Sequence, residues 1–149
     1  MATIRVAQSA EIAAAPGAVY RLLADYRKGH PGVLPKSIRI VSIDKGGYGA
    51  GTVVRARSRM AGQTRTFRFR VTEPEPGRVL MESEPESGTV TTFTVDPVRD
   101  GKHCRVEIAT KFAGRGGLAG RIERPLTSLL LRRVYRQELR NIAKVLRKT

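Results

Sequence analysis

The sequence predicts an α+β fold in which a mostly antiparallel sheet is covered by a long C-terminal helix. Residues 37–112 alternate apolar and polar side chains with the two-residue period of strands. The turns between these segments are too short for the crossovers that parallel strands need. The last part of the chain instead carries apolar residues at helical spacing. Strands bracketed by helices are typical of the α+β class, and the length suits a single domain over residues 1–149.

A strand and one or two short helices open the chain. Residues 3–12 place Ile4, Val6 and Ile12 on one side, which predicts a strand. Pro16 predicts a helix start, because proline at the first helical position loses no hydrogen bond. Residues 29–35 contain two glycines and two prolines, so they predict a loop or one short helical turn.

The most informative segment is a predicted hairpin, in which Thr52–Met60 runs back against Gln63–Val71 across a turn at Ala61-Gly62. A two-residue loop fixes the register, and side chains alternate faces along each strand. One face then carries the pairs Met60–Gln63, Ser58–Arg65, Ala56–Phe67 and Val54–Phe69. The other face carries Arg59–Thr64, Arg57–Thr66 and Arg55–Arg68. One register thus makes one face largely apolar and the other basic.

Further strands are predicted at residues 37–43, 78–83, 89–95 and 104–112, with turns at 84–88 and 96–101. The outward face of the hairpin carries an arginine cluster made of Arg55, Arg57, Arg59, Arg68 and Arg70. We expect the acidic residues at 73–75 and 82–86 to neutralise part of this cluster, since neighbouring like charges repel.

The C-terminal helix changes phase along its length. Its second half predicts an apolar face made of Leu131, Tyr135, Leu139, Ile142 and Leu146. The earlier apolar residues Leu118, Ile122, Leu126 and Leu129 project onto the opposite, basic side. Pro125 lies between the two and removes a backbone donor. The sequence therefore predicts a kink or break near Pro125, with residues 114–124 as a separately oriented segment.

Composition limits the classes of protein. The chain has 149 residues, 40% of them hydrophobic, and a net charge of +15. No apolar run reaches the roughly 20 residues of a membrane span, and the N-terminus does not resemble a signal peptide. The lone Cys104 forms no internal disulfide, which favours the cytoplasm.

The positive net charge favours anionic partners such as a membrane surface, or serves only to keep the protein in solution. Nucleic acid is disfavoured because aromatic residues do not interleave with the basic ones.

The sequence offers no clear catalytic constellation. His30 and His103 are far apart in the chain and outside any metal-ligand spacing, so we expect no metal site. No glycine-rich phosphate loop is present, and we expect no cofactor. Cys104 is better explained as a small strand residue than as a nucleophile. Whether the protein is an enzyme is therefore left open.

The ordered set of segments resembles the START-like, helix-grip (SRPBCC) superfamily, and within it the polyketide cyclase/dehydrase and lipid-transport branch. The segments that carry the resemblance are EIAAAPGAVYRLLADY, GYGAGTVVRARSRMAG, TEPEPGRVLMES, TTFTVDP, GKHCRVEIATKFAGRGG and GLAGRIERPLTSLLLRRVYRQELRNIAKVL. The resemblance implies a curved seven-stranded antiparallel sheet gripping the long helix, with an apolar cavity between them. It also implies a ligand such as a lipid, a polyketide or a quinone.

The inward faces supply the candidate ligand-binding residues. They are Val54, Ala56, Ser58, Arg65, Phe67, Phe69, Phe93, Phe112 and Tyr135. The alternative for the aromatic members is an ordinary filled core. Arg65 either reaches solvent from the cavity rim or contacts a carboxylate or hydroxyl of the ligand, because an inward charge must be paired or hydrated.

Three functions are therefore compatible with the sequence. The first is a binding or carrier protein for a small hydrophobic molecule. The second is a cyclase or dehydrase, for which Arg65, Tyr20, Tyr135 and Glu82 are loose candidates. The third is a basic module that docks on an anionic membrane or on a partner protein, using the arginines of the C-terminal helix.

Overall fold

The computed structural model describes residues 3–99, 101–113 and 117–147, and the side chains of residues 117–125 lie outside that description. The elements are β1 (Thr3–Ile12), α1 (Pro16–Ala24), α2 (Gly29–Val33), β2 (Ile38–Lys45), β3 (Val53–Met60), β4 (Gln63–Glu75), β5 (Val79–Glu84), β6 (Thr89–Val98), β7 (His103–Ala113) and α3 (Gly117–Arg147). This order confirms the predicted α+β class, with two short helices after the first strand and a long helix near the end.

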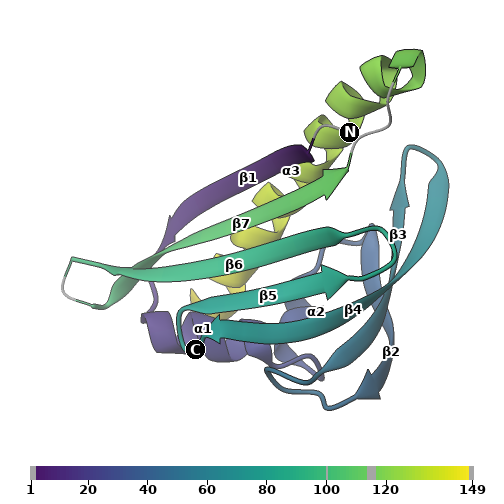
Figure 1. Cartoon of the computed structure of the whole chain (residues 1–149). Helices are drawn as coiled ribbons and strands as arrows, with labels where there is room; N and C mark the ends of the chain where they lie inside the picture. The colour runs from purple at the N-terminus through teal and green to yellow at the C-terminus, as the bar shows by residue number, and fades with distance from the viewer. Residues whose placement is uncertain (1–2, 100, 114–116, 148–149) are drawn as a thin grey trace.

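The seven strands form one sheet in the order β1-β7-β6-β5-β4-β3-β2. Every neighbouring pair is antiparallel. Figure 1 shows α3 crossing one face of this sheet, with α1 and α2 near the C-terminal end of the helix. An amide hydrogen bond of 2.9 Å from Asn141 to the carbonyl of Val33 ties α3 to α2. The arrangement is the helix-grip fold.

The register of the β3–β4 hairpin is the predicted one. Ala56 faces Phe67, and Arg55 faces Arg68. Ala61 and Gly62 both adopt positive φ, of 52° and 75°, as a two-residue type I′ turn requires. The turn therefore tolerates a strained alanine at its first position, and the apolar and basic faces separate as expected.

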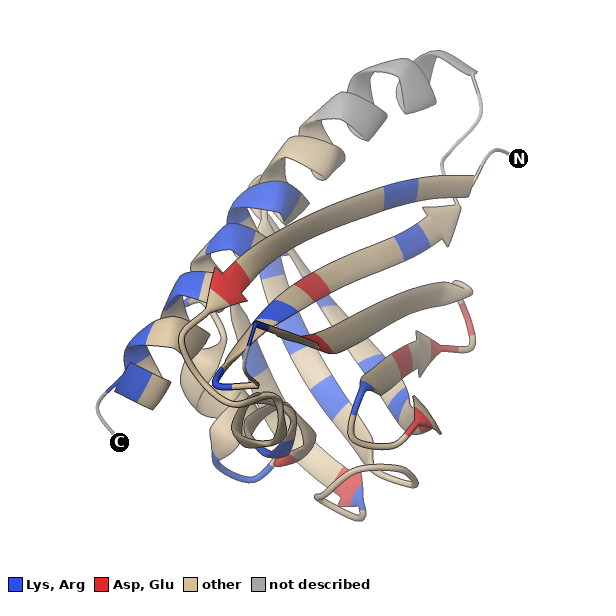
Figure 2. Ribbon diagram, turned by 90° about the vertical axis from the view of Figure 1, so that its left-hand side faces the viewer, with Lys and Arg blue, Asp and Glu red and all other residues tan. Residues whose placement is uncertain are grey.

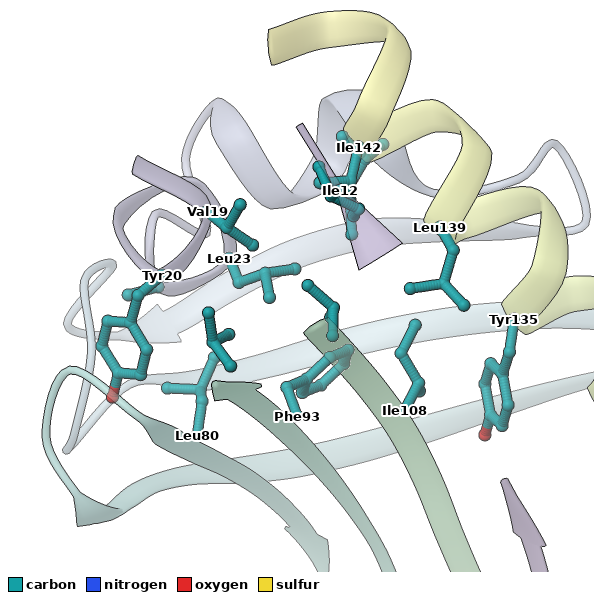
Figure 3. Packing of buried hydrophobic residues seen from close by; sticks show 14 of the residues in the cluster. Ile12, Val19, Tyr20, Leu23, Leu80, Phe93, Ile108, Tyr135, Leu139 and Ile142 are labelled. Carbon is teal, nitrogen blue, oxygen red and sulfur yellow. The ribbon is translucent and has the colours of Figure 1, made fainter. Parts of the chain in front are cut away.

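A hydrophobic core packs the last turns of α3 against the sheet and against α1. In Figure 3, Leu23 of α1 and Leu139 and Ile142 of α3 point toward Phe93 and Ile108 of the sheet. All five side chains are buried. Burial of each such side chain stabilises the fold by roughly 1.5–3 kcal/mol. This core fixes α3 against the sheet at one end of the interior.

The structure contradicts one predicted helix break and one predicted turn. The helix α3 continues from Gly117 to Arg147, so the break predicted near Pro125 is absent. One proline removes one hydrogen bond, which the rest of a long helix can outweigh. The orientations expected for Leu118 and Ile122 fall on side chains outside the described residues. Strand β6 also extends through Pro97 to Val98, where we expected a turn. From Asp96 onward it pairs only with β7, and proline is tolerated where no second neighbour needs its N–H.

In the part of the chain that the structure describes, no helix combines the length and the apolar character needed to cross a lipid bilayer.

Candidate functional site: an apolar cavity with a polar inner end

A cavity of about 670 Å³ lies between the sheet and α3. Small-molecule sites are typically cavities of roughly 300–1,000 Å³ with apolar walls and a few polar groups. The lining comes from the loop after α1, from α2, from the strands of the sheet and from α3. The interior is therefore not filled completely by the core, and the space left is of ligand size.

All nine candidate ligand-binding residues from the sequence analysis line this cavity: Val54, Ala56, Ser58, Arg65, Phe67, Phe69, Phe93, Phe112 and Tyr135. Val54, Ala56, Ser58, Phe93 and Tyr135 are buried, and the other phenylalanines are half-buried. Arg65 is exposed at the hairpin end of the cavity, in agreement with the alternative in which it reaches solvent from the cavity rim. The hairpin register brings most of this set together, because it turns alternate residues of β3 and β4 inward.

A row of polar side chains crosses the floor of the cavity. Glu82 of β5 is directly opposite Thr91 of β6, and Thr91 is opposite Thr110 of β7. The hydroxyls of Thr91 and Thr110 lie 2.8 Å apart, and Thr110 also hydrogen-bonds the hydroxyl of Tyr135 from α3. All four side chains line the cavity. Directly opposite residues lie close enough to interact, so the row forms a continuous polar band.

His30 lies at the most buried end of the cavity. Its Nδ1 donates a hydrogen bond of 2.7 Å to the carbonyl of Leu23, and its Nε2 is 3.7 Å from Oε1 of Glu138. Its ring stacks on Tyr26 and meets the ring of Phe93 edge-on. Burial alone lowers the pKa of His30, but the carboxylates of Glu138 and Glu82 outweigh it and raise the pKa to about 9. The imidazole is therefore protonated at neutral pH.

Glu82 is held by Tyr26, whose hydroxyl donates a hydrogen bond of 2.6 Å to Oε2. Burial raises the pKa of Glu82, while the charge of His30 and the bond from Tyr26 oppose that rise. Burial and the adjacent carboxylates also raise the pKa of the Tyr26 hydroxyl, so it stays protonated and donates. Burial raises the pKa of Tyr135 to about 12. The inner end, defined here as Tyr26, His30, Glu82 and Glu138, thus combines one cation with two carboxyl groups.

The opposite end of the cavity is exposed. Its lining includes Ala61, Gln63 and Arg65 of the hairpin and Leu126 of α3, all exposed to solvent. Arg65 precedes Val71 by six residues on β4, and Val71 is opposite Glu82. At roughly 3.3 Å per residue, this places Arg65 about 20 Å along the strand from the level of the inner end. The cavity therefore has polar groups at both ends and apolar walls between them.

The acidic residues predicted to neutralise the arginine cluster lie in different environments. Glu82 faces the cavity, and Glu84 accepts hydrogen bonds from the backbone N–H groups of Glu86 and Ser87 in its own turn. Asp44 of β2 instead pairs with both Arg55 and Arg68, at 2.9 and 3.4 Å. Figure 2 shows basic residues across the strands and along α3. A second hollow, of about 450 Å³, is lined by Arg55, Arg68 and Arg70 together with Glu84 and Glu86, so two of the predicted acidic residues do lie beside the cluster.

The candidate catalytic residues separate into two groups. Glu82, Tyr135 and Arg65 line the cavity, but Tyr20 does not; its hydroxyl donates a hydrogen bond of 2.6 Å to Glu73. Sequence reasoning missed Tyr26, His30 and Glu138 as site residues. Glu138 could have been found from the sequence. It lies at helical spacing from Tyr135 and Ile142, so it is an acidic residue within the apolar face of the C-terminal helix. Among the described residues, no group of three or more potential ligand side chains could hold a metal ion.

Solved structures share this fold over nearly the whole chain. The NMR structure of KanY protein matches with a TM-score of 0.83 and 28% identity, covering 97% of each chain. The crystal structure of the ZhuI aromatase/cyclase from Streptomyces sp. R1128 matches with a TM-score of 0.73 and 19% identity, covering 96% of this chain and 93% of that one. A START superfamily protein from Mycobacterium smegmatis matches with a TM-score of 0.61 and 14% identity, covering 95% and 93%. No curated protein matches the sequence.

The family model for polyketide cyclase/dehydrase and lipid transport proteins matches residues 3–147, from the first strand to the end of α3. This match covers every element that forms the cavity. The chain therefore belongs to the polyketide cyclase/dehydrase and lipid transport family.

Proposed function

We propose that this protein binds a small hydrophobic molecule, such as a lipid, a polyketide or a quinone, and carries it in the cytoplasm. The observation that supports the proposal most directly is the cavity of about 670 Å³, which is lined mainly by aliphatic and aromatic side chains. Apolar side chains around an unfilled space forgo packing contacts that a ligand would supply. The buried, unpaired Cys104 fits a reducing compartment.

Uptake of an apolar probe tests the proposal. We expect the neutral fluorophore N-phenyl-1-naphthylamine to gain fluorescence in the presence of the purified protein and to be displaced by the native ligand. Organic extraction of freshly purified protein, followed by mass spectrometry, should release a molecule that copurifies in a stoichiometric amount. Absence of both copurified ligand and probe uptake would contradict the proposal.

A basic surface beside the exposed end supports loading from an anionic membrane. Leu126 and Leu129 of α3 are 46% and 42% exposed and lie three residues apart on the helix, so they form one small apolar patch. Arg132, Arg136 and Arg140 follow on the same helix and are also exposed. Apolar side chains flanked by cations are suited to the interface of an anionic bilayer.

An enzyme of the cyclase or dehydrase type is the second candidate, and the ionisable inner end favours it. The half-buried Glu82 and the buried pair of His30 and Glu138 are the kind of acid and base groups that move protons in such reactions. Incubation with poly-β-ketone thioester analogues should then give cyclised or dehydrated products by mass spectrometry. Glu82→Gln and His30→Gln should lower kcat, and unchanged turnover in both variants would remove these residues from the mechanism.

A further inference from the structure

The inner end of the cavity contains more carboxyl groups than cations. Glu82 and Glu138 face a single cation, His30, and the described cavity lining holds no lysine, and no arginine other than Arg65 at the exposed end. When both carboxyl groups are ionised, one negative charge lacks a compensating positive charge. Burying such a charge is costly unless it gains a proton or a partner. The raised pKa of Glu82 is consistent with this deficit.

The carboxyl oxygens of Glu82 and Glu138 accept fewer hydrogen bonds than such atoms can. Among the described residues, Glu82 accepts one hydrogen bond, from Tyr26 to Oε2, and its Oε1 accepts none. Glu138 has a side chain only 4% exposed, and its one contact with a described cation is the 3.7 Å approach of His30, which is longer than a hydrogen bond. Both residues line the cavity. Buried carboxylates normally accept several hydrogen bonds, so these acceptors are available to a ligand.

The neighbouring band adds further polar atoms but no cation. Thr91 and Thr110 share a hydrogen bond, and Tyr135 bonds to Thr110. These hydroxyls lie beside Glu82 across the sheet. They can orient a polar group that enters this end, although they supply no positive charge to hold an anion.

We propose that the inner end recognises a ligand whose leading group donates hydrogen bonds, an amine or a hydroxyl, and rejects a leading carboxylate or phosphate. This inference rests on the proposed binding function and narrows its ligand class. A carboxylate entering first would meet two acidic groups and one imidazolium already paired with them. An ammonium or hydroxyl group would instead satisfy Oε1 of Glu82 and the carboxylate of Glu138. An amphiphile with an acidic head would have to keep that head at the exposed end, near Arg65.

Matched ligands of one chain length separate these outcomes. Dodecylamine, dodecanol and dodecanoate would compete against N-phenyl-1-naphthylamine for the wild type, Glu82→Gln and Glu86→Gln. Glu86 lies in the exposed turn after β5 and gives the same change of charge outside the cavity. We expect Glu82→Gln to weaken dodecylamine binding about tenfold or more, because it removes a charge partner inside the cavity, and to leave dodecanoate binding unchanged or tighter. Glu86→Gln should change neither.

The results distinguish failure of the proposed binding function from failure of the proposed ligand class. If the fluorophore itself does not bind, the proposed function fails before the inference is reached. If the fluorophore binds but Glu82→Gln shifts dodecylamine and dodecanoate by the same factor, the ligand class is wrong while the binding function stands. Glu138→Gln provides a second variant in case Glu82→Gln does not fold. It should likewise weaken the binding of dodecylamine and leave the binding of dodecanoate unchanged or tighter.

Discussion

The hydroxyl of Tyr26 donates a 2.6 Å hydrogen bond to Oε2 of Glu82, joining the loop after α1 to the middle of β5. Both residues line the cavity, and Tyr26 is almost completely buried. This bond is the one direct hydrogen bond from a described residue that holds the Glu82 carboxyl group in place. The ring of the same tyrosine stacks on His30, so Tyr26 contacts two ionisable groups of the inner end.

Tyr26→Phe should lower the free energy of unfolding by about 1–3 kcal/mol, because the carboxyl group of Glu82 loses its donor while the ring packing is retained. Chemical denaturation at neutral pH measures this loss. Tyr48→Phe is the matched control, since Tyr48 is 57% exposed and its hydroxyl accounts for little buried polar surface. Equal stability of the two variants would show that water or rearrangement replaces the bond to Glu82.

The ion pair of His30 predicts a dependence of stability on pH. Folding raises the pKa of His30 from 6.5 to about 9, so the folded state binds the proton more tightly than the unfolded state. The stabilisation is complete below pH 6.5, declines as the pH rises, and is lost above about pH 9. Glu138, Glu82 and Tyr26 are the ionisable groups that face the imidazole, and Tyr26 remains neutral throughout this range.

Denaturation of the wild type and His30→Gln from pH 6 to pH 9 checks this dependence. The difference in unfolding free energy between the two proteins should shrink as the pH rises, because only the wild type loses the proton-linked stabilisation of His30. A difference that stays constant over the range would mean that His30 does not carry its charge in the folded protein.

The sequence predicted the walls of the cavity better than its inner end, for a physical reason. The register of the hairpin is a local property, since a two-residue turn and the alternation of β3 and β4 determine which side chains face inward. The pair of His30 and Glu138, in contrast, joins a five-residue helix to the middle of α3 and depends on how α2 packs against α3. Nothing in the local pattern around His30 indicates that a carboxylate will lie beside it.

Filling the cavity should abolish binding without unfolding the protein. Ala56 is buried, lines the cavity and faces Phe67, so Ala56→Phe places a ring in open space. We expect at least a tenfold loss of N-phenyl-1-naphthylamine affinity, with the free energy of unfolding within about 1.5 kcal/mol of the wild type. Thr66→Phe adds a similar volume on the outer face and should bind the probe normally. Unchanged affinity in Ala56→Phe would place the probe elsewhere.

The helix surface next to the exposed end of the cavity predicts salt-sensitive binding to anionic vesicles. Reversal of Arg132, Arg136 and Arg140 to glutamate should remove most of the binding to phosphatidylserine-containing vesicles at low salt, since each basic residue near the surface contributes about 1 kcal/mol. Added salt should weaken the wild type in the same direction, because screening acts on exposed charges. Cosedimentation with vesicles measures both effects.

Reversal of Arg39, Arg57 and Arg70 is the matched control for that experiment. These three arginines are exposed on β2, β3 and β4, and their reversal gives the same change in net charge on the sheet rather than on α3. If docking depends on the helix beside Leu126 and Leu129, the sheet variant should retain most of its vesicle binding. Equal losses in the two variants would mean that the net charge of +15, and not a particular surface, attracts the protein to the membrane. Equal binding of the wild type to neutral and anionic vesicles would exclude both explanations.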